Sequence, residues 1–403
     1  MPKTYKEINE KIKKGQAVVV TAEEIIDIVE KEGIDEAYKN IDVVTTATFG
    51  IMCSSGCFLN FGHTRPKIRM SEAWLNDVRI YTGIAAVDAY LGATELQHND
   101  PENRYFPGEF KYGGGHVIED LVSKKDIQLF ALSYGTDDYT RRDLRTMINI
   151  NSLNQATMVN PRNCYQNYNV AVNAHKERTI YTYMGPLKPN MQNATYSSAG
   201  QLSPLLNDPL CKTIGIGTKV WLAGAHGHIY SQGTQHTTDC KRTKNNVPEE
   251  GAATLALTAD MKHMDSEYVR GASIKGYGAS LALGIGIPIP ILDKEILKST
   301  CIKDEDIYAP VIDYSKDYPK RLSNTIAKVN YKQLKSGKIK INNKKVKTSS
   351  MSSYPKAKKI ASILKKEIQT SKFTLNEPYE KLPENQPFNQ LEIRDNKRDD
   401  KKQ

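Results

Sequence analysis

The chain has 403 residues, of which 39% are hydrophobic and 25% charged, and this balance excludes a disordered or fibrous protein. No apolar run approaches the roughly 20 residues that a membrane-spanning helix needs, and the start MPKTYKEINEKIKKG contains no secretory signal. Six cysteines are too few for a disulfide scaffold, so we expect reduced thiols in a cytoplasmic protein.

The net charge of +10 comes from the C-terminal quarter of the chain. Residues 311–403 carry 23 Lys and Arg against 10 Asp and Glu, whereas residues 1–310 carry 33 against 36. The lysines recur along short amphipathic segments, where a solvated face is their usual place. RNA binding by residues 330–372 is the alternative, but we predict no nucleic-acid partner and no membrane partner.

Three elements are predicted in the first hundred residues. Thr21 and Glu24 form a capping box before the apolar stripe of a helix that ends near Gly33. The β-branched residues 41–49 predict a strand. Residues 72–96 predict a short strand followed by a tightly packed helix, and residues 99–115 a long surface loop.

Strands and turns are predicted to dominate residues 117–300. The expected strands cover residues 127–134, 180–183, 213–223, 253–259 and 281–292. The last is apolar almost throughout and should be buried on both faces, but Pro288 and Pro290 should exclude it from a central position in a sheet.

The C-terminal part weakly repeats the pattern of the N-terminus. Residues 330–341 and 4–20 each predict a short helix, a glycine stop and a strand, and a further helix is predicted at residues 354–369. The expected fold class is α+β, a sheet-rich mixed core with peripheral helices and a small lysine-rich C-terminal subdomain. We divide the chain into a main domain (1–310), a lysine-rich part (311–383) and a disordered tail (384–403).

Cys53 is the foremost candidate for chemistry. It follows the predicted strand 41–49 in the loop Met52-Cys-Ser-Ser-Gly56, whose backbone N–H groups can stabilise a thiolate and lower the pKa of the thiol. Cys57 and the segment Asn60-Phe-Gly-His63-Thr-Arg65 follow closely. The alternative is a buried and inert cysteine.

Two further polar segments carry side chains that could bind a ligand. His226, His228, His236 and Cys240 are a possible zinc set, but their spacing is irregular, so we predict no metal site. Asn160-Pro-Arg162-Asn163 is a polar turn whose arginine suits a carboxylate. The glycine clusters match neither a dinucleotide-binding motif nor a P-loop.

Several strings together resemble the homocysteine-biosynthesis family of methanogens and other anaerobes, which includes the L-aspartate semialdehyde sulfurtransferases. They include TTATFGIMCSSG (45–56), FLNFGH (58–63), YGGGHVIEDL (112–121) and NPRN (160–163), and continue at residues 179–185, 202–209, 233–236 and 284–290. The likeness extends from about residue 4 to about residue 383.

The resemblance implies that sulfide is incorporated into L-aspartate semialdehyde to give L-homocysteine through a persulfide on Cys53. It implies no bound cofactor, an external reductant that acts through a ferredoxin-like partner, and a homo-oligomer. The site residues that we carry over are His116 or His63 for proton transfer and, for substrate binding, Arg162, Arg65, Asn163, Ser54, Ser55, Gly114 and Gly115.

Asp138 departs from the family pattern. The family string usually reads Gly-Thr-Asp-Cys-Tyr, and its cysteine resembles a persulfide carrier, but here Asp138 stands in its place. A carboxylate cannot hold a persulfide, so Cys53 acts alone, Cys57 or Cys164 takes over, or the reaction has changed. The alternative function is therefore a non-catalytic or divergent relative that binds an iron–sulfur or ferredoxin-like partner.

Overall fold

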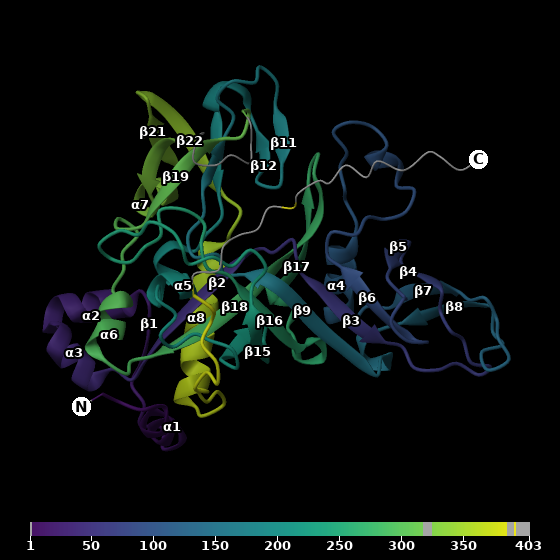
Figure 1. Ribbon diagram of the computed structural model, residues 1–403, viewed down its shortest axis with the longest axis horizontal. Helices are drawn as coiled ribbons and strands as arrows, with labels where there is room; N and C mark the ends of the chain where they lie inside the picture. The colour runs from purple at the N-terminus through teal and green to yellow at the C-terminus, as the bar shows by residue number, and fades with distance from the viewer. Residues whose placement is uncertain (1, 317–324, 385–390, 392–403) are drawn as a thin grey trace, which may run out of the picture.

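The computed structural model describes residues 2–316, 325–384 and 391. Figure 1 shows a large sheet through the centre of the molecule, a second sheet above it and a four-stranded sheet at the right. The predicted α+β class, with a sheet-rich core and peripheral helices, is confirmed. No helix of the described residues is long and apolar enough to cross a membrane.

The main sheet has ten strands. Its order is β1 (Val19–Thr21), β2 (Val43–Ile51), β18 (Gly278–Pro290), β14 (Lys219–Leu222), β15 (Ala225–Gln232), β16 (Leu255–Asp260), β9 (Gln155–Asn163), β3 (Gly56–Asn60) and β6 (Asp88–Gly92), with β17 (Val269–Ile274) also paired to β18. β1 and β2 are parallel, and the other neighbouring strands of this sheet are antiparallel.

Strand β18 is buried along its whole length, as predicted, but its predicted exclusion from a central position is wrong. It lies between β2 and β14. Its pairing with β14 involves Ile285 and Gly286, whereas Pro288 and Pro290 lie further along the strand, opposite β2. The missing proline N–H groups therefore do not interrupt the ladder on the β14 side.

The smaller sheets are built from segments distant in sequence. The six-stranded sheet has the order β20 (Thr325–Asn330), β19 (Tyr308–Asp313), β10 (Val170–Val172), β13 (Asn193–Tyr196), β22 (Lys344–Ser350) and β21 (Lys338–Ile341). The four-stranded sheet has the order β5 (Val78–Ile80), β4 (Glu72–Leu75), β7 (Ile127–Leu132) and β8 (Asp143–Ile148), and β11 (Ile180–Thr182) pairs with β12 (Gly185–Leu187).

Strands of the lysine-rich part thus share a sheet with β10 and β13 from the middle of the chain. The division at residue 310 remains a prediction. The predicted disordered tail lies outside the described residues except for Glu384 and Leu391.

The helices lie around the sheets. They are α1 (Tyr5–Lys13), α2 (Glu24–Glu32), α3 (Ile34–Asn40), α4 (Gly114–Val122), α5 (Pro204–Asn207), α6 (Lys294–Ser299), α7 (Tyr331–Lys335) and α8 (Tyr354–Gln369). Short 3-10 turns occupy Pro101–Asn103, Ile150–Ser152, Pro189–Met191, Gly200–Leu202, Met261–His263 and Ser266–Tyr268.

The predicted helices at 24–33 and 354–369 and the repeated helix–glycine–strand pattern are confirmed. The helix predicted within 83–92 is wrong, because that segment contains β6, where Ala89 and Leu91 alternate into the core. Helix α4 was missed, because its three leading glycines are typical of a loop.

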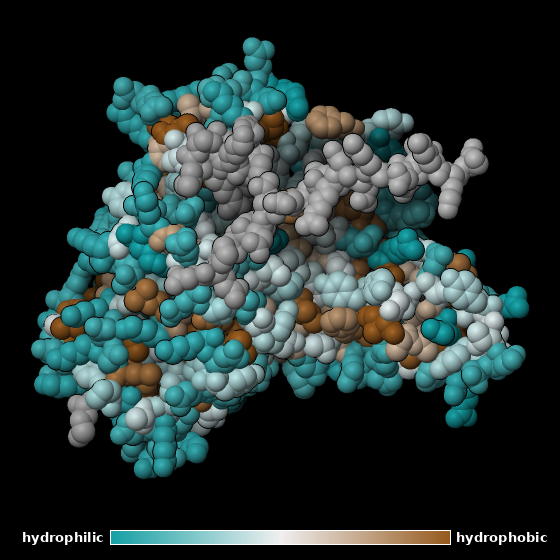
Figure 2. All heavy atoms as spheres, in the orientation of Figure 1, coloured by the Kyte–Doolittle hydropathy of each residue, from teal (hydrophilic) through white to brown (hydrophobic). Residues whose placement is uncertain are grey.

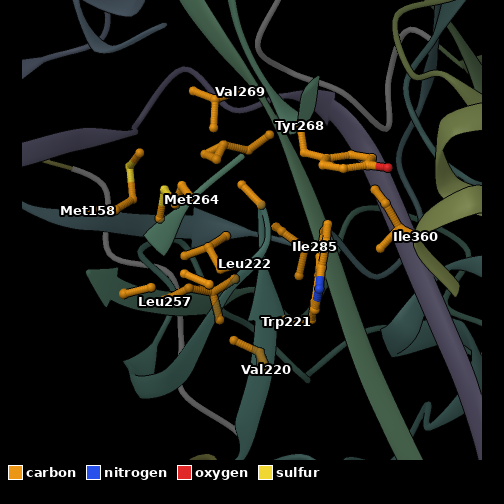
Figure 3. Packing of buried hydrophobic residues seen from close by; sticks show 14 of the residues in the cluster. Met158, Val220, Trp221, Leu222, Leu257, Met264, Tyr268, Val269, Ile285 and Ile360 are labelled. Atoms are coloured by element: carbon orange, nitrogen blue, oxygen red, sulfur yellow. The ribbon is translucent and has the colours of Figure 1, made fainter. Parts of the chain in front are cut away.

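Helix α8 packs on β2 and β18 in the centre of the molecule (Figure 1). A Cβ atom on Gly284 would lie 2.7 Å from Cδ1 of Ile360 and 3.1 Å from Cβ of Tyr268, so a larger residue here would force these neighbours to shift. Thr45 of β2 donates a hydrogen bond to the carbonyl of Ala361 at 2.9 Å. Figure 3 shows Ile360 beside the core that contains Trp221 and Tyr268.

Lysines of the basic C-terminal part form ion pairs with carboxylates from the rest of the chain. Lysines of α8 form ion pairs with the N-terminal part, namely Lys358 with Glu23 at 3.0 Å and Lys365 with Glu24 at 2.7 Å. Lys359 pairs with Glu267 at 2.7 Å. Part of the C-terminal positive charge therefore lies against carboxylates of the first 310 residues.

We expect Gly284→Ala to lower the free energy of unfolding by about 1–3 kcal/mol, because it overpacks a tight contact. Ile360→Val removes the methyl group that the new Cβ atom would meet, at its own cost of about 1 kcal/mol. The double variant should therefore lose less than the sum of the single losses. Urea unfolding followed by circular dichroism measures the free energy of unfolding of the two single variants and the double variant. If the loss in the double variant equals the sum of the two single losses, the contact between Gly284 and Ile360 is contradicted.

Candidate active site

Cys53 lies in the tight turn that joins β2 to β3. The backbone N–H and the hydroxyl of Ser55 both donate to the carbonyl of Met52, at 3.0 and 2.7 Å. The N–H of Met52 donates to the carbonyl of Leu281 at 2.7 Å, which fixes the turn to β18. Ser55 therefore holds the loop and is itself buried, so its predicted contact with substrate is not supported.

The Cys53 thiol has one of the predicted backbone N–H contacts, that of Cys53 itself, but burial outweighs it. Burial raises its pKa above the ordinary cysteine value, and two neighbours oppose this effect. The hydroxyl of Ser280 donates to Sγ at 3.2 Å, and the positive charge of Arg162 also favours the thiolate. The predicted lowering of the pKa is wrong because the sequence does not show how far the thiol is desolvated.

Cys53 faces a cavity of about 280 Å³ between the main sheet and the six-stranded sheet. Arg162 provides the only cationic side chain among its described lining residues. The lining consists of Ile51, Met52, Cys53, Ser54, Arg162, Tyr165, Tyr168, Tyr183, Met184, Ser197, Gln235, Tyr277 and Met351. The cavity thus combines one thiol and one cation with tyrosine hydroxyls and methionine side chains.

The tyrosines form a hydrogen-bonded row beside the cavity. The hydroxyl of Tyr183 lies 2.7 Å from that of Tyr168 and 2.9 Å from that of Tyr314. The hydroxyl of Tyr165 donates to Oε1 of Gln235 at 3.2 Å. These contacts fix polar groups of the cavity wall in place.

Strand β9 sends neighbouring side chains in different directions near its end. Arg162 lines the cavity, and its carbonyl accepts a hydrogen bond from the hydroxyl of Ser54 at 3.2 Å. Asn163 is buried, and its amide donates to the carbonyl of Asn160 at 2.9 Å. The structure therefore brings Ser54 and Arg162 to Cys53, but not Asn163.

His116 lies on the other face of the β17–β18 hairpin from Cys53. Its Nε2 atom is 3.2 Å from the hydroxyl of Ser273, which lies opposite Ala279 in the hairpin. Adjacent residues of a strand point to opposite faces, so Ser280, which bonds Cys53, faces away from His116. The predicted proton transfer by His116 at Cys53 is not supported.

Gly114 and Gly115 allow α4 to pack closely. Their N–H groups donate to the carbonyls of Glu95 at 2.7 Å and Ala93 at 2.9 Å, so they are not available to a substrate oxygen. A Cβ atom on Gly115 would lie 1.9 Å from the carbonyl oxygen of Ser280. The glycines thus serve packing behind the site, and the predicted oxyanion role is not supported.

His63, Arg65 and Asp138 are exposed and belong to another part of the surface. Asp138 lies between β7 and β8, and the ring of the adjacent Tyr139 is 6.0 Å from that of His63. The guanidinium of Arg141 donates to the carbonyl of Arg65 at 3.1 Å. These contacts hold the three residues in one region, but none of them lines the Cys53 cavity.

The two thiols considered as substitutes for Cys53 are buried elsewhere. Cys57 lies on β3 and Cys164 follows β9. Burial raises the pKa of both thiols to about 12, and neither lines the cavity. Among the described residues, Cys53 is therefore the single cysteine of this cavity.

The alternative zinc set is dispersed. His226 pairs with Glu367 at 3.0 Å, while His236 is buried and contacts the carbonyl of Thr254 at 2.9 Å. In the part of the chain that the structure describes, no three His, Cys, Asp or Glu side chains converge on a metal site.

Sequence reasoning missed Ser280 and the tyrosines. A hydroxyl in the otherwise apolar run Gly278-Ala-Ser-Leu-Ala-Leu was a detectable sign, because a buried polar side chain needs a partner. The tyrosines gave no such sign. They come from separate loops in a chain with 22 tyrosines.

Comparison with known proteins points to one family. Residues 17–375 match the model described as homocysteine biosynthesis enzyme, sulfur-incorporation. The L-aspartate semialdehyde sulfurtransferase of Methanocaldococcus jannaschii is 49% identical over 401 residues, which cover 96% of this chain and 75% of that protein. Its namesake in Methanosarcina acetivorans is 48% identical over 383 residues, covering 94% and 72%. No solved structure matches.

We expect Ser280→Ala to raise the pKa of Cys53 further, because it removes a hydrogen bond that favours the thiolate. Alkylation of Cys53 by iodoacetamide should then rise at higher pH and be roughly threefold to tenfold slower at neutral pH. Mass spectrometry of the Cys53 peptide measures the rate. Ser273→Ala, on the other face of the hairpin, is the control, and equal pH profiles for both variants would contradict the assignment.

Proposed function

Because the chain belongs to the homocysteine biosynthesis family of sulfur-incorporation enzymes, we propose that it is an L-aspartate semialdehyde sulfurtransferase that makes L-homocysteine. The family resemblance predicted from the sequence is confirmed. The observation that carries the mechanism is the Cys53 cavity, in which one thiol lies beside one cation, Arg162.

Cys53 is the proposed carrier of sulfur. Its thiolate takes the outer sulfur of a small persulfide donor, R′–S–SH, which gives Cys–S–SH and releases the thiol R′–SH, so this step needs no external oxidant. The terminal sulfur then adds to the aldehyde carbon, and the aldehyde oxygen takes up a proton to form Cys–S–S–CH(OH)–R. This addition requires a nucleophilic sulfur and a polarised carbonyl in one cavity.

Reduction completes the reaction. Two electrons and two protons cleave the S–S bond, which restores the Cys53 thiol and releases HS–CH(OH)–R. Loss of water gives a thioaldehyde, and two further electrons and protons give the thiol of homocysteine. The net reaction of aldehyde and persulfide donor therefore consumes four electrons and four protons and produces one water and one thiol, R′–SH.

Arg162 is the proposed binding group for the α-carboxylate of the substrate. A guanidinium can form a bidentate pair with a carboxylate, and no other cation lies in the described lining. The same charge favours the thiolate of Cys53. Arg162 is therefore proposed both to bind the substrate carboxylate and to favour the thiolate form of Cys53.

Hydroxyl groups are the proposed proton donors in the cavity. No imidazole or carboxyl side chain is among the described lining residues, whereas Tyr168 and Tyr183 place hydrogen-bonded hydroxyls there. A hydroxyl near the aldehyde oxygen can stabilise the charge that develops when sulfur adds. This role replaces the one predicted for His116 and His63.

The position of Asp138 bears on the alternative of a non-catalytic relative. Because this residue lies outside the Cys53 cavity, its carboxylate removes no group from the proposed site. We therefore favour an active enzyme in which Cys53 carries the sulfur alone. The external electrons come, in this proposal, from a ferredoxin-like partner protein.

We expect Cys53→Ser to abolish formation of homocysteine from L-aspartate semialdehyde and a persulfide donor, because a hydroxyl cannot carry the persulfide. The wild-type Cys53 peptide should also gain about 32 Da, one sulfur atom, after exposure to a sulfide donor under oxidising conditions. Cys301→Ser, at a partly buried thiol after α6, is the matched control and should retain activity. Undiminished turnover by Cys53→Ser would rule out the mechanism.

We expect Arg162→Met to raise KM for L-aspartate semialdehyde by about tenfold to a hundredfold, because a charge-assisted contact to the carboxylate is lost. The pH profile of kcat should also move to higher pH, since the charge that favours the Cys53 thiolate is gone. Steady-state kinetics measure both effects. Arg145→Met on the exposed strand β8 is the control, and an unchanged KM for Arg162→Met would exclude the carboxylate contact.

A further inference from the structure

The β21–β22 hairpin carries four exposed lysines on one face. Lys338 lies opposite Lys347, and Lys340 lies opposite Lys345. The residues between them, including Val346, are buried on the other face, so the four ammonium groups share the solvent side. We call these four side chains the lysine face. Figure 2 shows hydrophilic side chains over this upper corner, where Figure 1 places β21 and β22.

The charge of the lysine face is not balanced within the described chain. Like charges directly opposite each other destabilise a hairpin, and no carboxylate of the described residues forms an ion pair with these four. Neighbouring lysines of the same part are paired. They are Lys328 with Glu249 at 2.9 Å, Lys332 with Glu305 at 2.7 Å and Lys335 with Asp304 at 2.6 Å.

Protection of a sheet edge does not explain the whole pattern. Lysines on an edge strand discourage unwanted strand pairing, and β21 is at the end of its sheet. Strand β22, however, pairs with β21 on one side and, from Lys347 onward, with β13 on the other. Lys347 therefore has no edge to protect, although it lies opposite Lys338.

The lysine face leads directly to the wall of the Cys53 cavity. Strand β22 ends at Ser350, and the next residue, Met351, lines the cavity. At about 3.3 Å per residue, Lys347 lies roughly 13 Å from Met351 along the strand. A protein bound at this face would thus be close to the place where the proposed reaction consumes electrons.

We propose that the lysine face is the docking surface for a small acidic iron–sulfur protein that supplies the electrons of the reduction steps one at a time. This inference rests on the proposed sulfurtransferase function. Each transfer oxidises one reduced cluster of the donor, and the protons come from solvent. Complementary charge steers such encounters and raises their rate. RNA is less suited, because residues 338–350 contain no aromatic side chain on which a base could stack.

The test replaces all four lysines of the lysine face by glutamine and compares two reductants. With a reduced plant-type [2Fe–2S] ferredoxin, which is acidic, we expect KM for the ferredoxin to rise about tenfold and its salt dependence to weaken. With titanium(III) citrate, which needs no docking surface, turnover should equal that of the wild type. The control changes Lys6, Lys14, Lys31 and Lys372, which are exposed elsewhere, to glutamine.

The outcomes separate the two proposals. An unchanged KM for ferredoxin, or an equal rise in the control, would overturn the docking surface. No homocysteine from the wild type with either reductant would overturn the proposed function instead. Loss of binding to a fluorescent single-stranded RNA without a change in ferredoxin KM would assign the face to nucleic acid. A thermal melt checks folding, and Lys340→Gln with Lys345→Gln serves as a milder second variant.

Discussion

The close contact between α8 and strand β18 is the constraint on which the rest of the molecule depends. It is possible because Gly284 leaves room for Ile360. The helix near the C-terminus thereby covers β2 and β18, whose ends carry Cys53 and Ser280. The pairing of β2 with β18 beneath this helix, with Ile51 opposite Ala282, brings the turn that carries Cys53 beside Ser280.

Ion pairs between α8 and the first 310 residues also hold this helix against the rest of the molecule. The lysines of α8 lie against glutamates from the first 310 residues, including Glu23 and Glu267. Exposed pairs of this kind contribute little each, roughly 0–1 kcal/mol, but together they match the basic C-terminal part to the acidic rest of the chain. The net charge of the whole chain is therefore a poor guide to function, and only the lysines left without carboxylates point to a partner.

The sequence allowed the fold class and helices α2 and α8 to be predicted, because these depend on local patterns. It also singled out Cys53 and Arg162, which the structure places at one cavity and whose roles are part of the proposed function. What it did not allow depends on contacts between distant segments. Ser280 reaches Cys53 only through strand pairing, and His116 is turned away by the same hairpin. Pro288 led to a wrong prediction because only the assembled sheet shows that this residue lies beyond the part of β18 that pairs with β14.

The cavity wall comes from two different sheets, with Arg162 on one and Met351 following a strand of the other. A ligand that touches both walls binds only when both sheets are folded, so its binding energy is shared between them. A molecule that fills this cavity would therefore also act as a crosslink between the two sheets.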